Sequence, residues 1–218
     1  MPREHYVQQL RSLQDDLLRL AGLAEVAVGR AITALQNQDV EEARRIIAED
    51  DIIDRQQYAL EDRALLLIAR QAPMAVDLRT ISAVISIASE LERIGDYAEG
   101  IAKIAIRGAG EPLLKPLIDV PRMAEKAQQM LRAAVEAFVN RDVEAARRLG
   151  IADTEVDDLT TQVQNELLAF MLRDPNNIER ALHLMFVAHN LERVADRTTN
   201  IAERLVFLVT GEIEDLNG

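Results

Sequence analysis

The sequence predicts an all-α protein built as two tandem three-helix bundles, with six long antiparallel helices related by an internal duplication. Three observations lead to this prediction: the composition, the helical spacing of apolar residues, and a repeated pair of motifs. The chain has 218 residues, of which nine are Gly, six are Pro and only 3% are aromatic. So few turn residues and β-formers disfavour a sheet, whereas abundant Ala, Leu, Ile, Arg and Glu favour helix.

Apolar residues recur at helical spacing along the first two segments. Each set falls on one side of a helix with 3.6 residues per turn, which predicts an amphipathic helix with one buried face. The first set comprises Leu10, Leu13, Leu17, Leu20, Ala24, Ala27, Val28, Ala31 and Leu35, and the second comprises Ala43, Ile46, Ile47, Ile53, Leu60, Ala64 and Leu67.

Five breaks divide the chain into six helical segments. They lie at residues 37–39, 72–73, 108–112, 140–142 and 174–177, where Gly, Pro, Asn and Asp gather. Segments of roughly 25–33 residues, at a rise of about 1.5 Å per residue, predict rods about 40–50 Å long. The short connections predict that successive rods are antiparallel neighbours.

Two of these breaks carry local predictions. Asp39, followed three residues later by Glu42, predicts a capping box at the start of the second helix. After the break at residues 72–73, we expect Met74, Val76 and Leu78 to begin the third helix and to pack on the core.

The internal repeat is more informative than the composition. Residues 37–46 (NQDVEEARRI) recur as residues 140–149 (NRDVEAARRL), with seven identities and one further similar pair in ten positions. Residues 88–103 recur as residues 188–203 with seven identities in sixteen. We therefore divide the chain into a first unit, 1–109, and a second unit, 110–218. The connection between them is short and apolar, so we expect the two units to pack as one body.

Charge and cysteine content exclude several classes of function. Asp and Glu number 37 against 25 Lys and Arg, a net charge of -12 that repels nucleic-acid phosphates and anionic lipid surfaces. We therefore expect no nucleic-acid partner. The absence of Cys excludes disulfides, thiol nucleophiles and Cys-based metal sites. Neither a signal-peptide pattern nor an apolar run of about 18–20 residues occurs, so we expect a cytoplasmic protein without direct membrane insertion.

Each half carries an acidic pair in its third predicted helix. The repeat preserves Glu-x-x-x-Asp as Glu92 with Asp96 and as Glu192 with Asp196. Four residues turn a helix by about 400°, so each pair lies on one face, one turn apart, where two carboxylates repel each other. Apolar neighbours place both pairs at the margin of a buried stripe, where partial burial is costly unless a cation lies between the carboxylates.

Further oxygen-bearing residues extend these pairs. The second predicted helix of each half repeats the i, i+4 acidic spacing, and an antiparallel arrangement brings it opposite the third-helix pair. We expect a cage of carboxylates in each half. The candidate metal ligands are Glu92, Asp96, Glu99, Asp50 and Asp54 in the first half, and Glu192, Asp196, Asn200, Glu203, Asp153 and Asp157 in the second.

Two interpretations of these carboxylates remain open. A cation held only by oxygen ligands is ordinary chemistry for Mg, Ca, Mn or Fe, and carboxylates also bridge clusters of ions. The alternative is that the same groups pair with Arg93, Arg193 or Arg197, as on many charged helix surfaces.

The sequence lacks the motifs of the common enzyme classes. A di-iron oxidase needs Glu-x-x-His on two helices, and that motif does not occur. Phosphate-binding glycine loops and a serine nucleophile elbow are also absent from the sequence. We expect His5, His183 and His189 to be solvated or hydrogen-bonded rather than metal ligands. The expectation is that the protein is not an enzyme.

Residues 90–96 (ELERIGD), 190–196 (NLERVAD) and 73–79 (PMAVDLR) closely resemble the PhoU family of bacterial phosphate-transport accessory proteins. The resemblance covers essentially the whole chain. It implies that the family's metal-binding motifs fall on Glu92, Asp96, Glu192 and Asp196, with iron the foremost metal and zinc, manganese, magnesium or calcium as alternatives. Asn200 stands opposite Gly100 and Glu203 opposite Lys103 in the repeat, so the two clusters need not be equivalent.

The resemblance also implies a function. PhoU-like proteins are negative regulators of phosphate uptake and of the phosphate-starvation response. They act as adaptors between the cytoplasmic ATPase side of the Pst phosphate ABC transporter and a PhoR-type sensor histidine kinase. A homodimer, held near the inner membrane through its partners, is implied as well.

Two other classes of function compete with this one. A metal-dependent enzyme or a metal-storage bundle would need an open coordination position beside a substrate pocket, and a hydrolytic or redox site would also need a nearby base. A purely structural helical adaptor would leave the carboxylates solvated.

Overall fold

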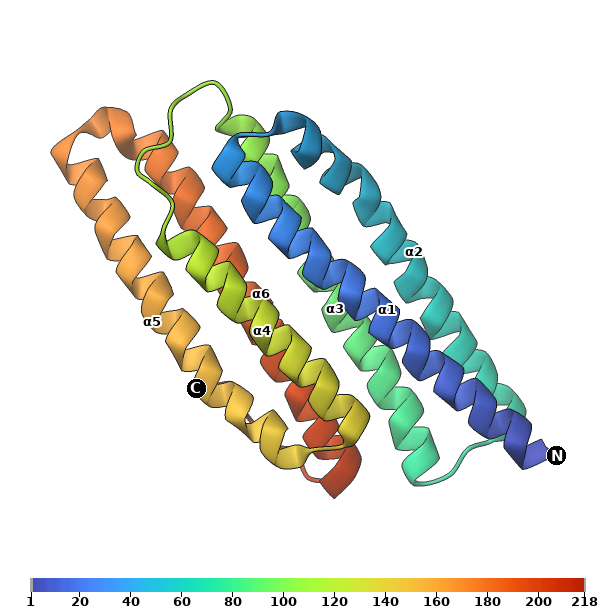
Figure 1. The fold of residues 1–218 in the computed structure, drawn as a ribbon. Helices are drawn as coiled ribbons and strands as arrows, with labels where there is room; N and C mark the ends of the chain where they lie inside the picture. The colour runs from blue at the N-terminus through green and yellow to red at the C-terminus, as the bar shows by residue number, and fades with distance from the viewer. Residues whose placement is uncertain (1, 218) are drawn as a thin grey trace.

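The computed structural model describes residues 2–217, and this part of the chain forms six long α-helices and one short 3-10 helix (Figure 1). The all-α prediction, with two related three-helix bundles, is confirmed. The elements in order are α1 (Pro2–Asn37), α2 (Val40–Gln71), α3 (Val76–Arg107), α4 (Asp119–Asn140), α5 (Val143–Arg173), η1 (Pro175–Asn177) and α6 (Ile178–Thr210).

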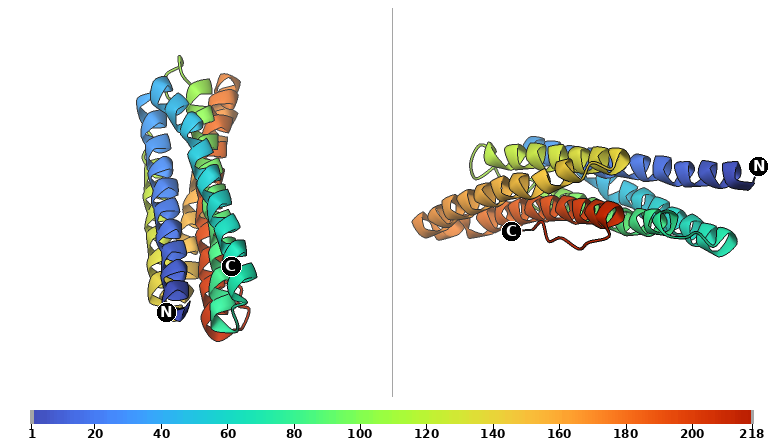
Figure 2. Two further views of the ribbon diagram at one scale, coloured as in Figure 1. Left: turned by 90° about the vertical axis from the view of Figure 1, so that its right-hand side faces the viewer. Right: turned by 90° about the horizontal axis from the view of Figure 1, so that it is seen from below.

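The two halves pack side by side along their central helices. α1, α2 and α3 contact one another, as do α4, α5 and α6, and the halves meet where α3 packs on α6 and α1 on α4 (Figures 1 and 2). In the described residues, α2 and α5 contact helices of their own half only, so they lie on the outside. Each outer helix therefore forms a solvent-facing seam with the central helix of its own half.

The apolar stripes predicted from the sequence form the core. Leu13, Leu17 and Leu20 of α1 are fully buried, as are Ala43 and Leu60 of α2. Central helices α3 and α6 bury the longest apolar faces because they have neighbours on more sides. The core is therefore continuous across both halves.

The repeated sequence at residues 37–46 and 140–149 builds the same helical hairpin twice. The residue before each capping Asp, Gln38 or Arg141, adopts a left-handed conformation, with φ of 52° and 53°. The Asp39 carboxylate accepts a hydrogen bond from the backbone N–H of Glu42 at 2.9 Å. Asp142 accepts one from the backbone N–H three residues later, also at 2.9 Å. The strong repeat thus encodes a helix N-cap.

The predicted capping box forms only in part. Asp39 caps α2, but its own backbone N–H donates to the Ala34 carbonyl, so it is not free to bind Glu42. The Glu42 carboxylate instead accepts hydrogen bonds from Arg30 at 2.6 Å and Arg45 at 2.9 Å. The half of the box that needs the glutamate side chain is replaced by these ion pairs.

The prediction that Met74, Val76 and Leu78 pack on the core is wrong. Met74 precedes α3 and is 82% exposed, and Val76 and Leu78 are exposed on its first turn. The buried face of α3 begins at Thr80 and Ile81. Met74 therefore lies outside the helix, and the first turn of α3 precedes its buried face.

After α6 the chain turns at Gly211 and residues 212–217 fold back along the second half (Figure 2). The backbone N–H of Leu216 donates to the Glu203 carboxylate at 2.9 Å, and Glu214 pairs with Arg147 at 2.6 Å. Gly150 lies beneath this segment, where a Cβ would come within 2.6 Å of the Leu216 carbonyl oxygen. Glycine is needed at position 150 for this close approach.

Among the residues that the structure describes, no helix combines the length and the apolarity needed to cross a bilayer.

Candidate metal centres

Five carboxylates gather on the seam between α2 and α3. Asp50 and Asp54 project from α2, opposite Glu92, Asp96 and Glu99 of α3, and each of the other four acts electrostatically on Asp50. The predicted meeting of the two helices' acidic residues is therefore present in the first half.

A glycine sets the approach of the two helices at this seam. A Cβ at Gly95 would lie 3.1 Å from an Asp50 carboxylate oxygen and 3.0 Å from Ile53 Cδ1. Both distances are tighter than ordinary van der Waals contact. Gly95 therefore lets α2 pack close to α3 and holds Asp50 against the acidic face of α3.

The first cluster carries an electrostatic penalty. Burial, followed by the repulsion of its acidic neighbours, raises the pKa of Asp50 from its ordinary value of 3.8 to about 7. Burial and neighbouring carboxylates also raise the pKa of Glu92 and of Asp96. Each group is easier to ionise if a cation is present.

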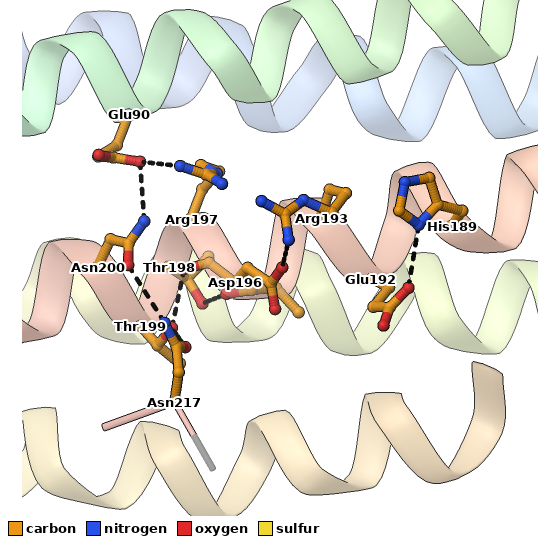
Figure 3. Close-up of polar contacts among 11 residues, drawn as sticks. Glu90, His189, Glu192, Arg193, Asp196, Arg197, Thr198, Thr199, Asn200 and Asn217 are labelled. Carbon is orange, nitrogen blue, oxygen red and sulfur yellow. Dashed lines mark hydrogen bonds and ion pairs between the residues drawn. The ribbon is translucent and has the colours of Figure 1, made fainter. Parts of the chain in front are cut away.

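The second half repeats this arrangement on the seam between α5 and α6. Asp153 and Asp157 of α5 interact with Glu192 and Asp196 of α6, which point toward α5 in Figure 3. Burial and then the Asp157, Asp196 and Glu192 carboxylates raise the pKa of Asp153 to about 7. Burial also raises the pKa of Asp157 and of Asp196, each with a contribution from Glu192.

Most of these carboxylates lack a cationic partner. Six of the candidate ligands have no side-chain hydrogen bond or ion pair in the described part of the chain: Asp50, Asp54, Glu92, Asp96, Asp153 and Asp157. The arginine-pairing alternative therefore does not describe the first cluster's core. It describes one residue of the second cluster, since Arg193 binds Asp196 at 2.5 Å.

Three carboxylates at the edges of the clusters do have partners. Glu99 pairs with Lys103, one turn along α3. Glu192 lies 3.2 Å from His189 Nδ1, so this histidine is bonded to a carboxylate on the exposed face of α6. Glu203 accepts the backbone N–H of Leu216.

The structure directs Asn200 and Glu203 away from the second cluster. Asn200 donates to the Glu90 carboxylate of α3 at 3.2 Å and accepts from Asn217 at 3.3 Å (Figure 3). Glu203 holds the C-terminal segment. Both positions are candidate ligands on helical spacing alone, which does not reveal partners on other elements.

The donor chemistry of the two clusters fits a hard cation. One carboxylate oxygen in each, Asp54 Oδ1 and Asp153 Oδ1, is buried without a hydrogen-bond partner, which is costly unless something binds it. Within residues 2–217, however, no three acidic or histidine side chains converge closely enough to hold one ion as they stand. Holding a metal therefore requires side-chain rotations.

A polar network that the sequence did not reveal links the two halves beside the second cluster. Arg197 of α6 binds Glu90 of α3 at 3.2 Å, and both side chains are largely buried. Arg193 donates to Asp196, and Tyr97 of α3 is a neighbour that raises the pKa of Arg193. The second cluster is thus tied to the interface between the halves, whereas the first is not tied to it by equivalent bonds among the described residues.

These features define a class of protein: a duplicated three-helix bundle in which the central helix of each half presents Glu-x-x-x-Asp to an acidic outer helix. Comparison with known proteins places the chain in one family of that class. The family model described as PhoU domain matches residues 17–105 and again residues 120–205. The chain belongs to the PhoU family.

Individual relatives cover nearly the whole chain. The phosphate-specific transport system accessory protein PhoU homolog of Clostridium acetobutylicum is 37% identical over 218 residues, all of this chain and all of the relative. The homolog of Aquifex aeolicus is 40% identical over 206 residues, 94% of this chain and 93% of the relative.

Solved structures agree with the fold. The crystal structure of PhoU from Pseudomonas aeruginosa matches with a TM-score of 0.90 and 31% identity, covering 95% of this chain and 100% of that one. The phosphate transport system regulatory protein PhoU from Streptococcus pneumoniae matches with a TM-score of 0.89 and 30% identity, covering 96% and 99%.

Proposed function

We propose that this protein is a cytoplasmic negative regulator of phosphate uptake and of phosphate-starvation signalling. In this role it links the ATPase side of a Pst-type phosphate ABC transporter to a PhoR-type sensor histidine kinase. The observation that carries the proposal is the full-length likeness to phosphate-specific transport accessory proteins, with both repeats and both acidic motifs present.

The physical character of the surface supports a role in binding proteins rather than in catalysis. Six long helices present broad faces, and the net charge of -12 favours association with basic cytoplasmic segments of membrane partners. Such association weakens as salt rises, because exposed charges are screened.

We further propose that the two carboxylate clusters bind metal, with iron foremost and zinc, manganese, magnesium or calcium as alternatives. Asp50, Asp54, Glu92 and Asp96 would hold it in the first half, with Glu99 at the edge. The second set would be Asp153, Asp157, Glu192 and Asp196. A bound cation would supply the positive charge that these seams lack.

Metal binding can regulate only if it favours one arrangement of the helices over another. The residues available for this are the carboxylates of the outer helices, α2 and α5, which face those of the central helices across each seam. Neutralising their repulsion would draw each outer helix toward its central helix. Partners that bind the outer faces of α2 and α5 would then have different affinities for the metal-bound and the metal-free protein.

A titration tests the two clusters separately. Mn²⁺ binding is measured by the loss of the free-ion EPR signal. Asp96→Asn should lose one class of Mn²⁺ site, and Asp196→Asn should lose the other. Because both substitutions remove charge without changing shape, the fold is preserved. Unchanged binding in both variants would contradict the proposed ligands.

The regulatory proposal is tested in the host. Deleting the gene should raise labelled phosphate uptake and a starvation reporter in phosphate-rich medium, and the wild-type gene should restore both. The Glu41→Ala/Glu144→Ala variant, which removes exposed carboxylates at repeat-related positions, should restore both equally well. Normal uptake and signalling in the deletion strain would contradict the proposal.

We also propose a homodimer in solution. Light scattering coupled to size-exclusion chromatography should give about twice the chain mass of 24.4 kDa. A monomer at micromolar concentration contradicts this.

A further inference from the structure

An open groove of about 770 Å³ lies between the C-terminal half of α3 and the N-terminal half of α6. Its floor includes Gly100, which faces Asn190 of α6, and a Cβ at position 100 would come within 3.0 Å of the Asn190 side chain. Along its α6 wall run Ile178, Leu182 and Phe186, all exposed, with Phe186 58% exposed. The groove is therefore an apolar surface that nothing in the described chain covers.

The internal duplication provides a reference for this groove. With residues 88–103 aligned on residues 188–203, Leu182 and Phe186 correspond to Ser82 and Ser86 of α3. Gly100 corresponds to Asn200, whose side chain reaches across to Glu90. The equivalent place in the other half is thus polar and bridged. The apolar side chains belong to this one end of the bundle, so the repeated fold does not require them.

The charges at the groove are basic, in contrast to the chain as a whole. Lys103 and Arg107 line the α3 side, and His183 lies on the α6 side, against a single carboxylate, Glu179. In the part of the chain that the structure describes, Arg107 and His183 have no ion pair. A basic, apolar groove on a protein of net charge -12 is complementary to an acidic amphipathic ligand.

One of these basic residues also touches the first carboxylate cluster. Lys103 is paired with Glu99, and Glu99 acts electrostatically on both Asp50 and Asp96. Lys103 therefore lies between the first cluster and the groove. If Glu99 turned toward the cluster, Lys103 would be freed for a ligand in the groove. If a ligand bound Lys103, Glu99 would be freed to turn toward the cluster.

We propose that this groove is the docking site for an acidic amphipathic helix of a partner protein, and that the Lys103–Glu99 ion pair couples docking to cation binding at the α2–α3 cluster. The coupling rests on the proposed metal-regulated function, whereas the docking site does not depend on it. Leu182 and Phe186 would bind the apolar face of the helix, and Lys103 and Arg107 its carboxylates. By linkage, cation binding and partner docking strengthen each other by the same factor.

The docking site is tested with a pair of labelled peptides. Both are amphipathic helices with the same leucine stripe, flanked by glutamates in one and by lysines in the other. Fluorescence anisotropy should show binding of the acidic peptide only. Phe186→Ser, which installs the residue found at the repeat-related position, should weaken that binding about tenfold, the loss expected for one aromatic anchor. Arg107→Glu should weaken it comparably.

A matched control comes from the opposite end of the same helix. Phe207→Ser changes a phenylalanine that is also partly exposed but lies outside the groove, and it should leave peptide binding unchanged. Failure of the acidic peptide to bind, equal binding of the lysine peptide, or insensitivity to Phe186→Ser would each overturn the docking site.

The coupling is tested by adding Mn²⁺ to the same assay. Mn²⁺ should tighten binding of the acidic peptide severalfold in the wild type and in Asp196→Asn, whose first cluster is intact. Glu99→Gln should bind the peptide tightly without Mn²⁺ and show no further gain. EPR on the same samples measures bound Mn²⁺, so it separates a failure of the coupling from a failure of the proposed metal site. Mn²⁺ bound without tighter peptide binding overturns the coupling, whereas the absence of bound Mn²⁺ contradicts the proposed metal site and leaves the docking result intact.

Discussion

Asp153 shows how a carboxylate buried in these clusters lowers the stability of the metal-free protein. It is 3% exposed, one of its oxygens lacks a partner, and burial raises its pKa to about 7. Because this pKa is higher in the folded state than the ordinary 3.8, the folded protein binds more protons between about pH 4 and 7. The free energy of unfolding of the metal-free protein therefore falls as pH rises through this range and levels off above it.

Asp153→Asn should remove much of this slope. With chelator present at pH 8, the variant should be more stable by about 1–2 kcal/mol, a fraction of the roughly 1.4 kcal/mol per pKa unit because water screens the cluster. At pH 4 the difference should be small. Urea unfolding at the two pH values measures it, and Asp62→Asn, on the exposed face of α2, is the control. A variant less stable than the wild type at pH 8 would contradict a destabilising effect of the buried Asp153 charge.

Positions on one helix, and across one antiparallel hairpin, could be predicted from the sequence. Glu92 and Asp96 share a face because they are four residues apart, and the opposing Asp50 and Asp54 follow from the antiparallel hairpin. The contact of Asn200 could not be predicted, because Glu90 comes from the other half of the chain. The sequence shows Lys103 four residues after Glu99, where an ion pair can form, but it does not show that Lys103 lies beside the α3–α6 groove.

At the scale of elements, the repeated N-caps are the clearest link from sequence to structure. Asp142→Ala should remove the side-chain acceptor for the N–H of Ala145 and cost about 1 kcal/mol. Asp39→Ala should cost about the same, and the double variant should show the sum, because the two hairpins are separate. Thermal or urea unfolding measures both.

Glu144→Ala, which removes an exposed carboxylate two residues beyond the Asp142 cap, serves as the control and should change stability by less than about 0.5 kcal/mol. A loss of stability in Glu144→Ala equal to that in Asp142→Ala would show that the cap is not responsible.

The boundaries of the six helices were predictable because Asn, Asp, Gly and Pro mark them in the sequence. Burial at a helix end was not, as Met74 shows. Its apolar side chain fits the expected stripe, but Met74 precedes the first residue of α3 and is exposed. Hydrophobic spacing predicts a buried face only for residues that the helix includes.

At the scale of the whole molecule, α3 and α6 join the halves through a largely buried polar contact. Arg197 and Glu90 bind each other across this interface at 3.2 Å. Glu90→Ala should leave Arg197 without its carboxylate and destabilise the protein by about 2–3 kcal/mol. Arg197→Met/Glu90→Met should be closer to the wild type, because neither charge is then left unpaired.

A double-mutant cycle with Arg197→Ala and Glu90→Ala, measured by urea unfolding, gives the coupling energy directly. Additive losses would contradict the view that this ion pair contributes to joining the halves.

The proposal that the two acidic seams are metal sites is tested by elemental analysis. The protein is purified from its own host without chelator, beside a variant with alanine at Glu92, Asp96, Glu192 and Asp196. We expect metal in stoichiometric amount in the wild type and its loss in a variant that remains folded by circular dichroism. Absence of metal from both proteins, or equal metal in both, would contradict the claim.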